Sequence, residues 1–319
     1  MYKPIEGAKK ALKVNLGVRP KETVFIIAEE STSRDAKYFL EAGKELDIDI
    51  TMITIPELNF NGEEPSGIVR KVMRLPNSMI LATKNSLSTT NARIQASNAG
   101  VRIFNMPSFS KVMLTRGPIE ADFKKIKPKV WALADLISKA EDVKITTNNG
   151  SNLKFSIKGR EGRARDALCE EPGSYRSMSV EANTAPLEDS ANGILMVDLA
   201  SPTDMMLDEP VKITFKDGFI VKIEGKENAV RLQEFFKKIG DKNIFCIAEI
   251  GIGLNPASKL TGNNYIEDES AIGTAHVGIG RNTGSGGKNK AKGHFDLIFK
   301  KPDIFFDNTC IMKDGQLEF

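Results

Sequence analysis

Both histidines of this 319-residue chain lie near its C-terminal end, at positions 276 and 294. Asp296 follows His294 by two residues, and Glu249 lies in an apolar run upstream. On a β-strand His294 and Asp296 would point to the same face. Neutral imidazole and carboxylate groups are common ligands of divalent metals. The spacing therefore predicts either a cation shared by these side chains or a plain histidine–aspartate hydrogen bond inside a β core.

Composition narrows the class of protein. Hydrophobic residues make up 40% of the chain and charged residues 27%, and the formal net charge is +3, which is typical of a globular protein without a nucleic-acid partner. The three cysteines are far apart, which favours a reducing compartment over a disulfide framework. The chain has no apolar run of the ~20 residues that cross a membrane and no apolar signal core at its N-terminus. We therefore expect a cytoplasmic protein with no membrane partner.

The pattern of apolar residues along the sequence changes near residue 143. Upstream, apolar strand patterns alternate with helical ones, which predicts parallel βαβ units. The expected strands are residues 23–28, 48–55, 79–82 and 101–105; the expected helices are 33–46, 66–75, 89–98 and a connector at 119–140 with Trp131 on its apolar face. Downstream, short strands flank turn sequences, as at 143–157 and 211–223. The predicted fold class is α/β, with a parallel-sheet α/β domain (residues 1–142) followed by a β-rich metal-binding domain (residues 143–319).

Two glycine-rich stretches do not match nucleotide-binding motifs. The stretch GRNTGSGGKNKAKG at 280–293 has Asn282 where a phosphate loop needs its first glycine, and Asn289 where it needs Ser or Thr. The run beginning at Gly251 has Pro256 in place of the third glycine of a dinucleotide fingerprint. We interpret both stretches as loops near a site.

The motifs occur in an order that resembles a known family. EIGIGLNP begins at 249, GTAH ends at 276, GGKN spans 286–289, and HFD begins at 294; VEANTAPLEDSANGILMVD lies upstream at 180–198. This order resembles the thermophilic-type leucyl aminopeptidases, the aminopeptidase T family. The resemblance implies a homodimer that removes N-terminal residues from small peptides with a metal-activated water. It also implies two divalent ions per chain, zinc, manganese or cobalt, held by Glu181, Glu249, His276, His294 and Asp296.

A peptidase also needs a general base and a group that stabilises the oxyanion. Glu249 can serve as the base if it does not bind metal, and Glu269 or Asp268 are the other candidates. The acidic stretch IEDES around these two residues is equally typical of a solvated loop. Lys288 or Arg281 are candidate oxyanion donors.

The chain departs from the family at several positions. Ser179 and Val180 precede Glu181, where the family has proline and glycine, and Thr283 stands where the aminopeptidases have a tyrosine seven residues after the first histidine. A related branch, similar to 2,5-dihydroxypyridine dioxygenases, holds one iron with two histidines and one aspartate. His276, His294 and Asp296 could supply such a triad. The alternatives to a peptidase are therefore an iron dioxygenase and a non-catalytic metal-binding relative.

Overall fold

The computed structural model describes residues 2–203, 206–260 and 265–319. Contacts group the chain into two compact units. The first contains Met1–Lys125 and Asp166–Ser179, and the second contains Ile126–Arg165 and Val180–Phe319. This grouping differs from the predicted division between residues 142 and 143, because residues 126–142 pack with the second unit and residues 166–179 return to the first.

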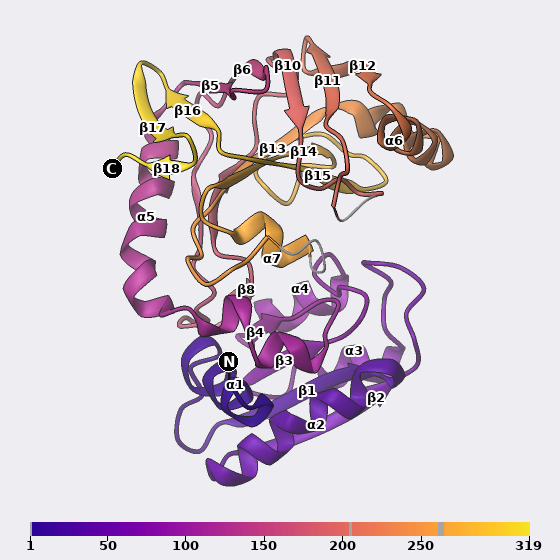
Figure 1. Ribbon diagram of the computed structural model, residues 1–319. Helices are drawn as coiled ribbons and strands as arrows, with labels where there is room; N and C mark the ends of the chain where they lie inside the picture. The colour runs from indigo at the N-terminus through magenta and orange to yellow at the C-terminus, as the bar shows by residue number, and fades with distance from the viewer. Residues whose placement is uncertain (1, 204–205, 261–264) are drawn as a thin grey trace. The chain divides into compact units, whose positions relative to one another are not determined.

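The first unit is built on a parallel sheet with the strand order β2-β1-β3-β4-β8 (Figure 1). Helices alternate with its first four strands, as predicted, and β3 is buried along its whole length. The strands are β1 Thr23–Glu29, β2 Asp49–Ile55, β3 Ser78–Ala82, β4 Arg102–Asn105 and β8 Tyr175–Ser177; the helices are α1 Pro4–Lys10, α2 Glu30–Glu45, α3 Gly67–Val72 and α4 Asn91–Asn98. The predicted α/β class is correct.

Glu29 is the last residue of β1, at the carboxyl end of the strand. Ligands of open α/β sheets bind in the crevice at this end of the strands, where the strand order reverses, and here that point lies between β1 and β3. The Glu29 carboxylate is fully buried and accepts hydrogen bonds from the backbone N–H groups of Leu58, Lys84 and Asn85. The chain's own acidic side chain therefore occupies the crevice, in keeping with the missing glycine fingerprint.

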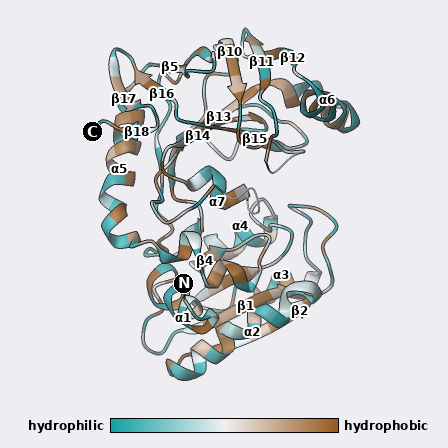
Figure 2. Ribbon diagram, viewed as in Figure 1, coloured by the Kyte–Doolittle hydropathy of each residue, from teal (hydrophilic) through white to brown (hydrophobic). Residues whose placement is uncertain are grey.

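Helix α5, Phe123–Lys139, is amphipathic, with teal and brown residues alternating along it in Figure 2. It begins after a short 3-10 turn at Gly117–Glu120, and Pro128 lies inside it. The prediction that Trp131 faces the core is wrong, because its side chain is 51% exposed. The core positions are instead Val130, Leu133 and Ile137, which recur at the helical spacing of three to four residues.

The second unit contains two antiparallel sheets. One has eight strands in the order β12-β11-β10-β6-β5-β16-β17-β18, and the other has five in the order β15-β14-β13-β9-β7. The first sheet comprises β5 Asp142–Thr146, β6 Asn152–Ser156, β10 Asn192–Val197, β11 Val211–Lys216, β12 Phe219–Glu224, β16 Asp303–Phe306, β17 Thr309–Lys313 and β18 Gln316–Leu317. Helix α6, Glu227–Ile239, follows β12. The predicted hairpins at 143–157 and 211–223 are present.

The five-stranded sheet contains the candidate site. Its strands are β7 Arg163–Arg165, β9 Glu181–Thr184, β13 Ile247–Gly253, β14 Thr274–Gly280 and β15 His294–Lys300, and helix α7, Tyr265–Ser270, packs against β13 and β14. Every residue of β13 and β14 is buried. Ionisable side chains on these strands therefore lie inside the protein rather than on its surface. Among the described residues, no helix has the length and apolar character to span a bilayer.

Candidate metal centre

One face of the five-stranded sheet carries the ionisable side chains, and the other carries apolar ones. On β13 and β14 the alternation of a strand places Ile250, Ile252, Val277 and Ile279 on one face and Glu249 and His276 on the other. Directly paired residues of antiparallel strands share a face, so the register adds Glu181, His294 and Asp296 to the same side. All five predicted ligand residues thus lie on a single face.

Each of these side chains lies opposite a glycine on a neighbouring strand. Gly251 pairs with His276, Gly253 with Glu181, and Gly280 with His294, while Gly278 pairs with both Glu249 and Asp296. A methyl group at Gly251 would come within 2.2 Å of His276 Nε2. One at Gly278 would come within 2.8 Å of Asp296 Oδ1 and His294 Cε1. The glycines therefore leave the space that the functional side chains fill.

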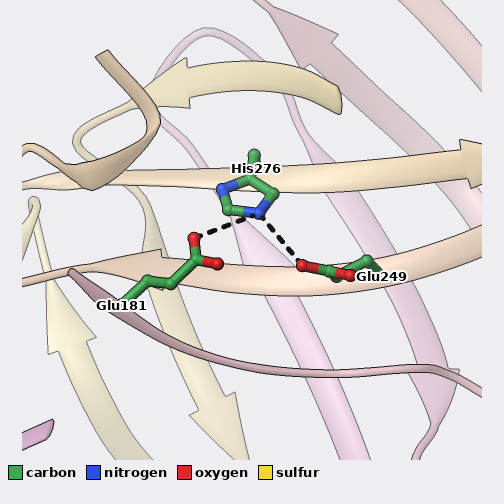
Figure 3. Close-up of side chains that lie close together, drawn as sticks. All are labelled: Glu181, Glu249 and His276. Atoms are coloured by element: carbon green, nitrogen blue, oxygen red, sulfur yellow. Dashed lines mark ion pairs between the residues drawn. The ribbon is translucent and has the colours of Figure 1, made fainter. Parts of the chain in front are cut away.

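Glu181, Glu249 and His276 form the innermost group (Figure 3). His276 Nε2 lies 3.6 Å from Glu181 Oε2 and 3.6 Å from Glu249 Oε1. One ligand atom from each residue lies within 4.8 Å of the others, and all three side chains are buried. A single cation placed among these atoms could contact all three.

Glu249 also faces the second histidine. Its Oε2 lies 3.8 Å from His294 Nε2, which is 3.1 Å from Asp296 Oδ1. His294 Nδ1 is 2.7 Å from the Arg281 carbonyl oxygen, which can only accept a hydrogen bond, so Nδ1 carries a proton. Nε2 then either carries a second proton shared with Asp296 or has a lone pair available for a cation. The structure thus contains the predicted histidine–aspartate contact, and the role of the pair as metal ligands stays a prediction.

Burial and mutual charge set the ionisation of the cluster. Burial raises the pKa of Glu249, but the two imidazoles and the Ser285 hydroxyl outweigh it and lower that pKa to about 2. Burial raises the pKa of Glu181, and the charge of His276 only partly opposes this. Burial lowers the pKa of His294, yet Asp296 and Glu249 raise it to about 10. Without a metal, the cluster holds its protons on the imidazoles.

Two buried polar atoms of the cluster have no hydrogen-bond partner among the described residues. They are Glu181 Oε2 and His276 Nδ1. Burying a polar atom without a partner is costly, so both atoms indicate a missing ligand or solvent molecule. Oxygen and imidazole nitrogen donors without thiolate suit iron, manganese, cobalt or zinc in their divalent states. The cluster therefore fits a divalent cation.

Two residues that support the cluster were not predicted. The Asn183 side-chain amide donates to Glu181 Oε1 at 2.7 Å, and the Ser285 hydroxyl donates to Glu249 Oε2 at 2.5 Å. Asn183 lies two residues after Glu181, so the strand alternation of the sequence could have revealed it. No pattern in the glycine-rich segment singles out Ser285, because its position depends on how that loop folds.

The glycine-rich loop is fixed through Glu188. The carboxylate of Glu188 accepts the Lys288 backbone N–H at 2.6 Å and the Asn282 side-chain amide at 3.0 Å, and it forms a salt bridge with Arg160. Arg160 also donates to the carbonyl of Gly286, one residue beyond Ser285. The loop is thus held beside the site by charged and polar side chains. Its position agrees with the interpretation of this glycine-rich stretch as a loop near a site.

The acidic stretch IEDES is helical rather than a solvated loop. It lies in α7, where Asp268 and Glu269 are buried. Burial, together with the charges of Glu181 and Asp296, raises the pKa of Glu269 well above its ordinary value. The raised pKa favours the protonated form of Glu269, and its predicted role as a general base stays a prediction. Thr283 and Lys288 are exposed on the loop.

The structure defines an α/β protein with an aminopeptidase T-like fold and a buried carboxylate–histidine cluster whose donor atoms suit a divalent cation. Wild-type AmpT from Thermus thermophilus matches it with a TM-score of 0.71 and 14% identity, covering 99% of both chains. A solved 2,5-dihydroxypyridine dioxygenase from Pseudomonas putida matches with a TM-score of 0.82 and 20% identity, covering 99% of this chain and 96% of that one. At these identities the structural likeness establishes the fold alone.

The chain belongs to the 2,5-dihydroxypyridine 5,6-dioxygenase family, whose model matches residues 5–319. A curated protein of that name from Pseudomonas putida is 26% identical over 235 residues. The aligned part covers 70% of this chain and 66% of that relative, just under two thirds of its length.

The prediction of a metallo-aminopeptidase is therefore wrong, and so are the hydrolase and protease class and the peptide-bond chemistry attached to it. The aminopeptidase likeness is one of fold. The physical reason for the error is that the predicted residues are of types that bind a divalent cation. Such a cation can take part in many different reactions, so these residues do not determine the reaction class. The aminopeptidases have a tyrosine seven residues after the first histidine, and this chain has Thr283 there.

Gly251→Ala tests whether the glycines make room for the cluster. Its new methyl group would collide with the His276 ring, so we expect destabilisation by roughly 1–3 kcal/mol and a loss of metal binding. Gly284→Ala is the matched control, because a methyl group there meets nothing within 4 Å. Thermal melting and metal content measure both effects. Full metal content in Gly251→Ala would show that the position of the His276 ring is unimportant.

The pKa of His294 predicts how metal binding depends on pH. Because that pKa is raised to about 10, the ring is protonated below that pH, and a metal must displace the proton throughout the neutral range. The Mn²⁺ affinity of chelator-treated protein should therefore rise about tenfold per pH unit for each proton displaced, from about pH 7 to about pH 9. Calorimetry in buffers of different ionisation enthalpy measures both affinity and proton release. An affinity that is constant above about pH 7, as for an unperturbed imidazole, would contradict the raised pKa.

Proposed function

We propose that this chain is an iron-dependent dioxygenase that opens the ring of a dihydroxylated pyridine. The observation that carries the proposal is the match of the dioxygenase family model to residues 5–319. The buried histidine–carboxylate cluster supports it, because two histidines and a carboxylate are the ligand types of non-haem iron oxygenases. Iron replaces the zinc, manganese or cobalt pair predicted with the peptidase.

The cation would be held by residues on two adjoining strands, β14 and β15. We assign His276, His294 and Asp296 as the ligands, with the Glu249 carboxylate between the two rings. A bound ferrous ion would supply the binding and reduction of dioxygen. The chain's contribution is to orient the side chains of the cluster: the Arg281 carbonyl oxygen holds the ligand His294, and the Ser285 hydroxyl holds the neighbouring Glu249.

The protein also controls water and protons around the substrate. The strands β13 and β14 are buried throughout, which keeps bulk water from the inner side of the cluster. Burial raises the pKa of Glu269 well above its ordinary value, which favours the protonated form. It is suited to donate that proton to an oxygen of the opening ring and to recover one from the product. The expected homodimer remains a prediction, and the mechanism does not depend on it.

Isotope labelling distinguishes a dioxygenase from a hydrolase. Protein loaded anaerobically with Fe²⁺ should consume dioxygen when given 2,5-dihydroxypyridine, and ¹⁸O₂ should label two oxygen atoms of the ring-opened product. Chelation of the iron should abolish oxygen consumption, and added Fe²⁺ should restore it. Mass spectrometry of the product and an oxygen electrode provide the measurements. Label entering from H₂¹⁸O instead of ¹⁸O₂, or no consumption of oxygen by the iron-loaded protein, would contradict the proposal.

A further inference from the structure

Arg165 places a positive charge beside the candidate metal centre. It lies on β7, the edge strand, and pairs directly with Glu181 on β9, so it projects from the same face as the cluster. It is close enough to lower the pKa of Glu181 by its charge. Its guanidinium is half-buried and forms no hydrogen bond or salt bridge with a described residue. The five donors of the guanidinium are thus available to a ligand.

Asn183 supplies a complementary acceptor on that face. Its side chain is 2% exposed, and its amide nitrogen donates to Glu181 Oε1. This bond fixes the orientation of the amide, because a carboxylate accepts from nitrogen and not from oxygen. The other end, Oδ1, is buried and has no hydrogen-bond partner among the residues described. A buried acceptor of this kind needs a donor from a ligand or from solvent.

The geometry points to Arg165 and Asn183 as a subsite that binds the lactam edge of the substrate. The inference rests on the proposed function and deepens it. A 2-hydroxypyridine can exist as its 2-pyridone tautomer, which presents a ring N–H donor next to a carbonyl acceptor. Asn183 Oδ1 accepts from the N–H, and the Arg165 guanidinium donates to the carbonyl oxygen. The subsite thereby selects a pyridine ring oxygenated beside its nitrogen.

The strand order places this subsite at a suitable distance from the metal ligands. Neighbouring strands are about 4.8 Å apart, so β7 lies roughly 10 Å from β13, with β9 between them. The two oxygen substituents of 2,5-dihydroxypyridine are attached to opposite (para) carbon atoms of the ring. A ring above Glu181 can therefore direct its 5-oxygen to the metal ligands and its 2-oxygen to Arg165.

The test compares two ligands that differ at the lactam edge. 3-Hydroxypyridine keeps the hydroxyl group directed to the metal but lacks both the 2-oxygen and the ring N–H of the pyridone. Binding of each compound to iron-loaded protein is measured by calorimetry without oxygen, so no turnover is needed. The protein as it stands should prefer 2,5-dihydroxypyridine by about 10- to 100-fold, the size expected for a charge-assisted hydrogen bond.

Arg165→Gln should reduce that preference to within about threefold by weakening the binding of 2,5-dihydroxypyridine alone. Arg165→Lys keeps the charge but not the planar fork, so it should retain part of the preference, and it serves if the glutamine variant does not fold. Arg163→Gln is the matched control. Arg163 lies on the same strand and face but donates to the Gly284 carbonyl, so its loss should leave the preference intact.

Asn183→Leu tests the acceptor with a side chain of similar size. It should lower the preference for 2,5-dihydroxypyridine by about tenfold, and circular dichroism monitors its folding. An unchanged preference in the folded Arg165 and Asn183 variants would overturn the subsite and leave the dioxygenase proposal standing. Binding of neither compound to the iron-loaded protein, together with no oxygen consumption, would overturn both.

Discussion

The structure depends on the electrostatic balance around the Glu249 carboxylate. Its Oε1 lies 3.6 Å from His276 Nε2, and its Oε2 lies 3.8 Å from His294 Nε2. The carboxyl groups of Glu181 and Glu269 are buried nearby, and the charge of Glu249 contributes to the raised pKa of each. Buried charges of one sign are tolerated only when opposite charge is supplied. In the chain without a metal, protons on the histidines supply that charge, because the pKa of both imidazoles is raised. Under the proposed function, a bound cation would take the place of those protons.

The residues around this cluster leave room for its side chains and hold them in place. Opposite each large ionisable side chain stands a glycine, and the far face of β13 and β14 is filled with aliphatic residues such as Ile250 and Val277. The loop that carries Ser285 is held by Glu188 and Arg160, which keeps the hydroxyl on Glu249. The sheet therefore positions the side chains of the cluster, and the loop holds Glu249 through the Ser285 hydroxyl.

The sequence predicted the fold class from local patterns. The residues themselves singled out Glu249, His276, His294 and Asp296, and the family resemblance added Glu181; the role of all five as metal ligands stays a prediction. Alternating apolar residues predict strands. His294 and Asp296 are two residues apart, so they share a face of whichever strand contains them.

The sequence left open, or predicted wrongly, what long-range packing decides. The acidic stretch containing Glu269, left open between a solvated loop and a catalytic segment, is buried against β13 and β14. The predicted core position of Trp131 is wrong, because its side chain is exposed although its helix is amphipathic. Neither the reaction class nor Ser285 followed from the pattern, because metal ligands define a cation while the groups that meet the substrate define the reaction.

The most direct test of the metal centre is anomalous diffraction at the iron absorption edge, from crystals grown anaerobically with Fe²⁺. The account predicts one strong anomalous peak in contact with the imidazoles of His276 and His294 and the carboxylate of Asp296. It also predicts that the His294–Asp296 hydrogen bond is replaced by bonds to the ion. A cluster without anomalous density, with His294 still hydrogen-bonded to Asp296 and iron only at surface positions, would contradict the account.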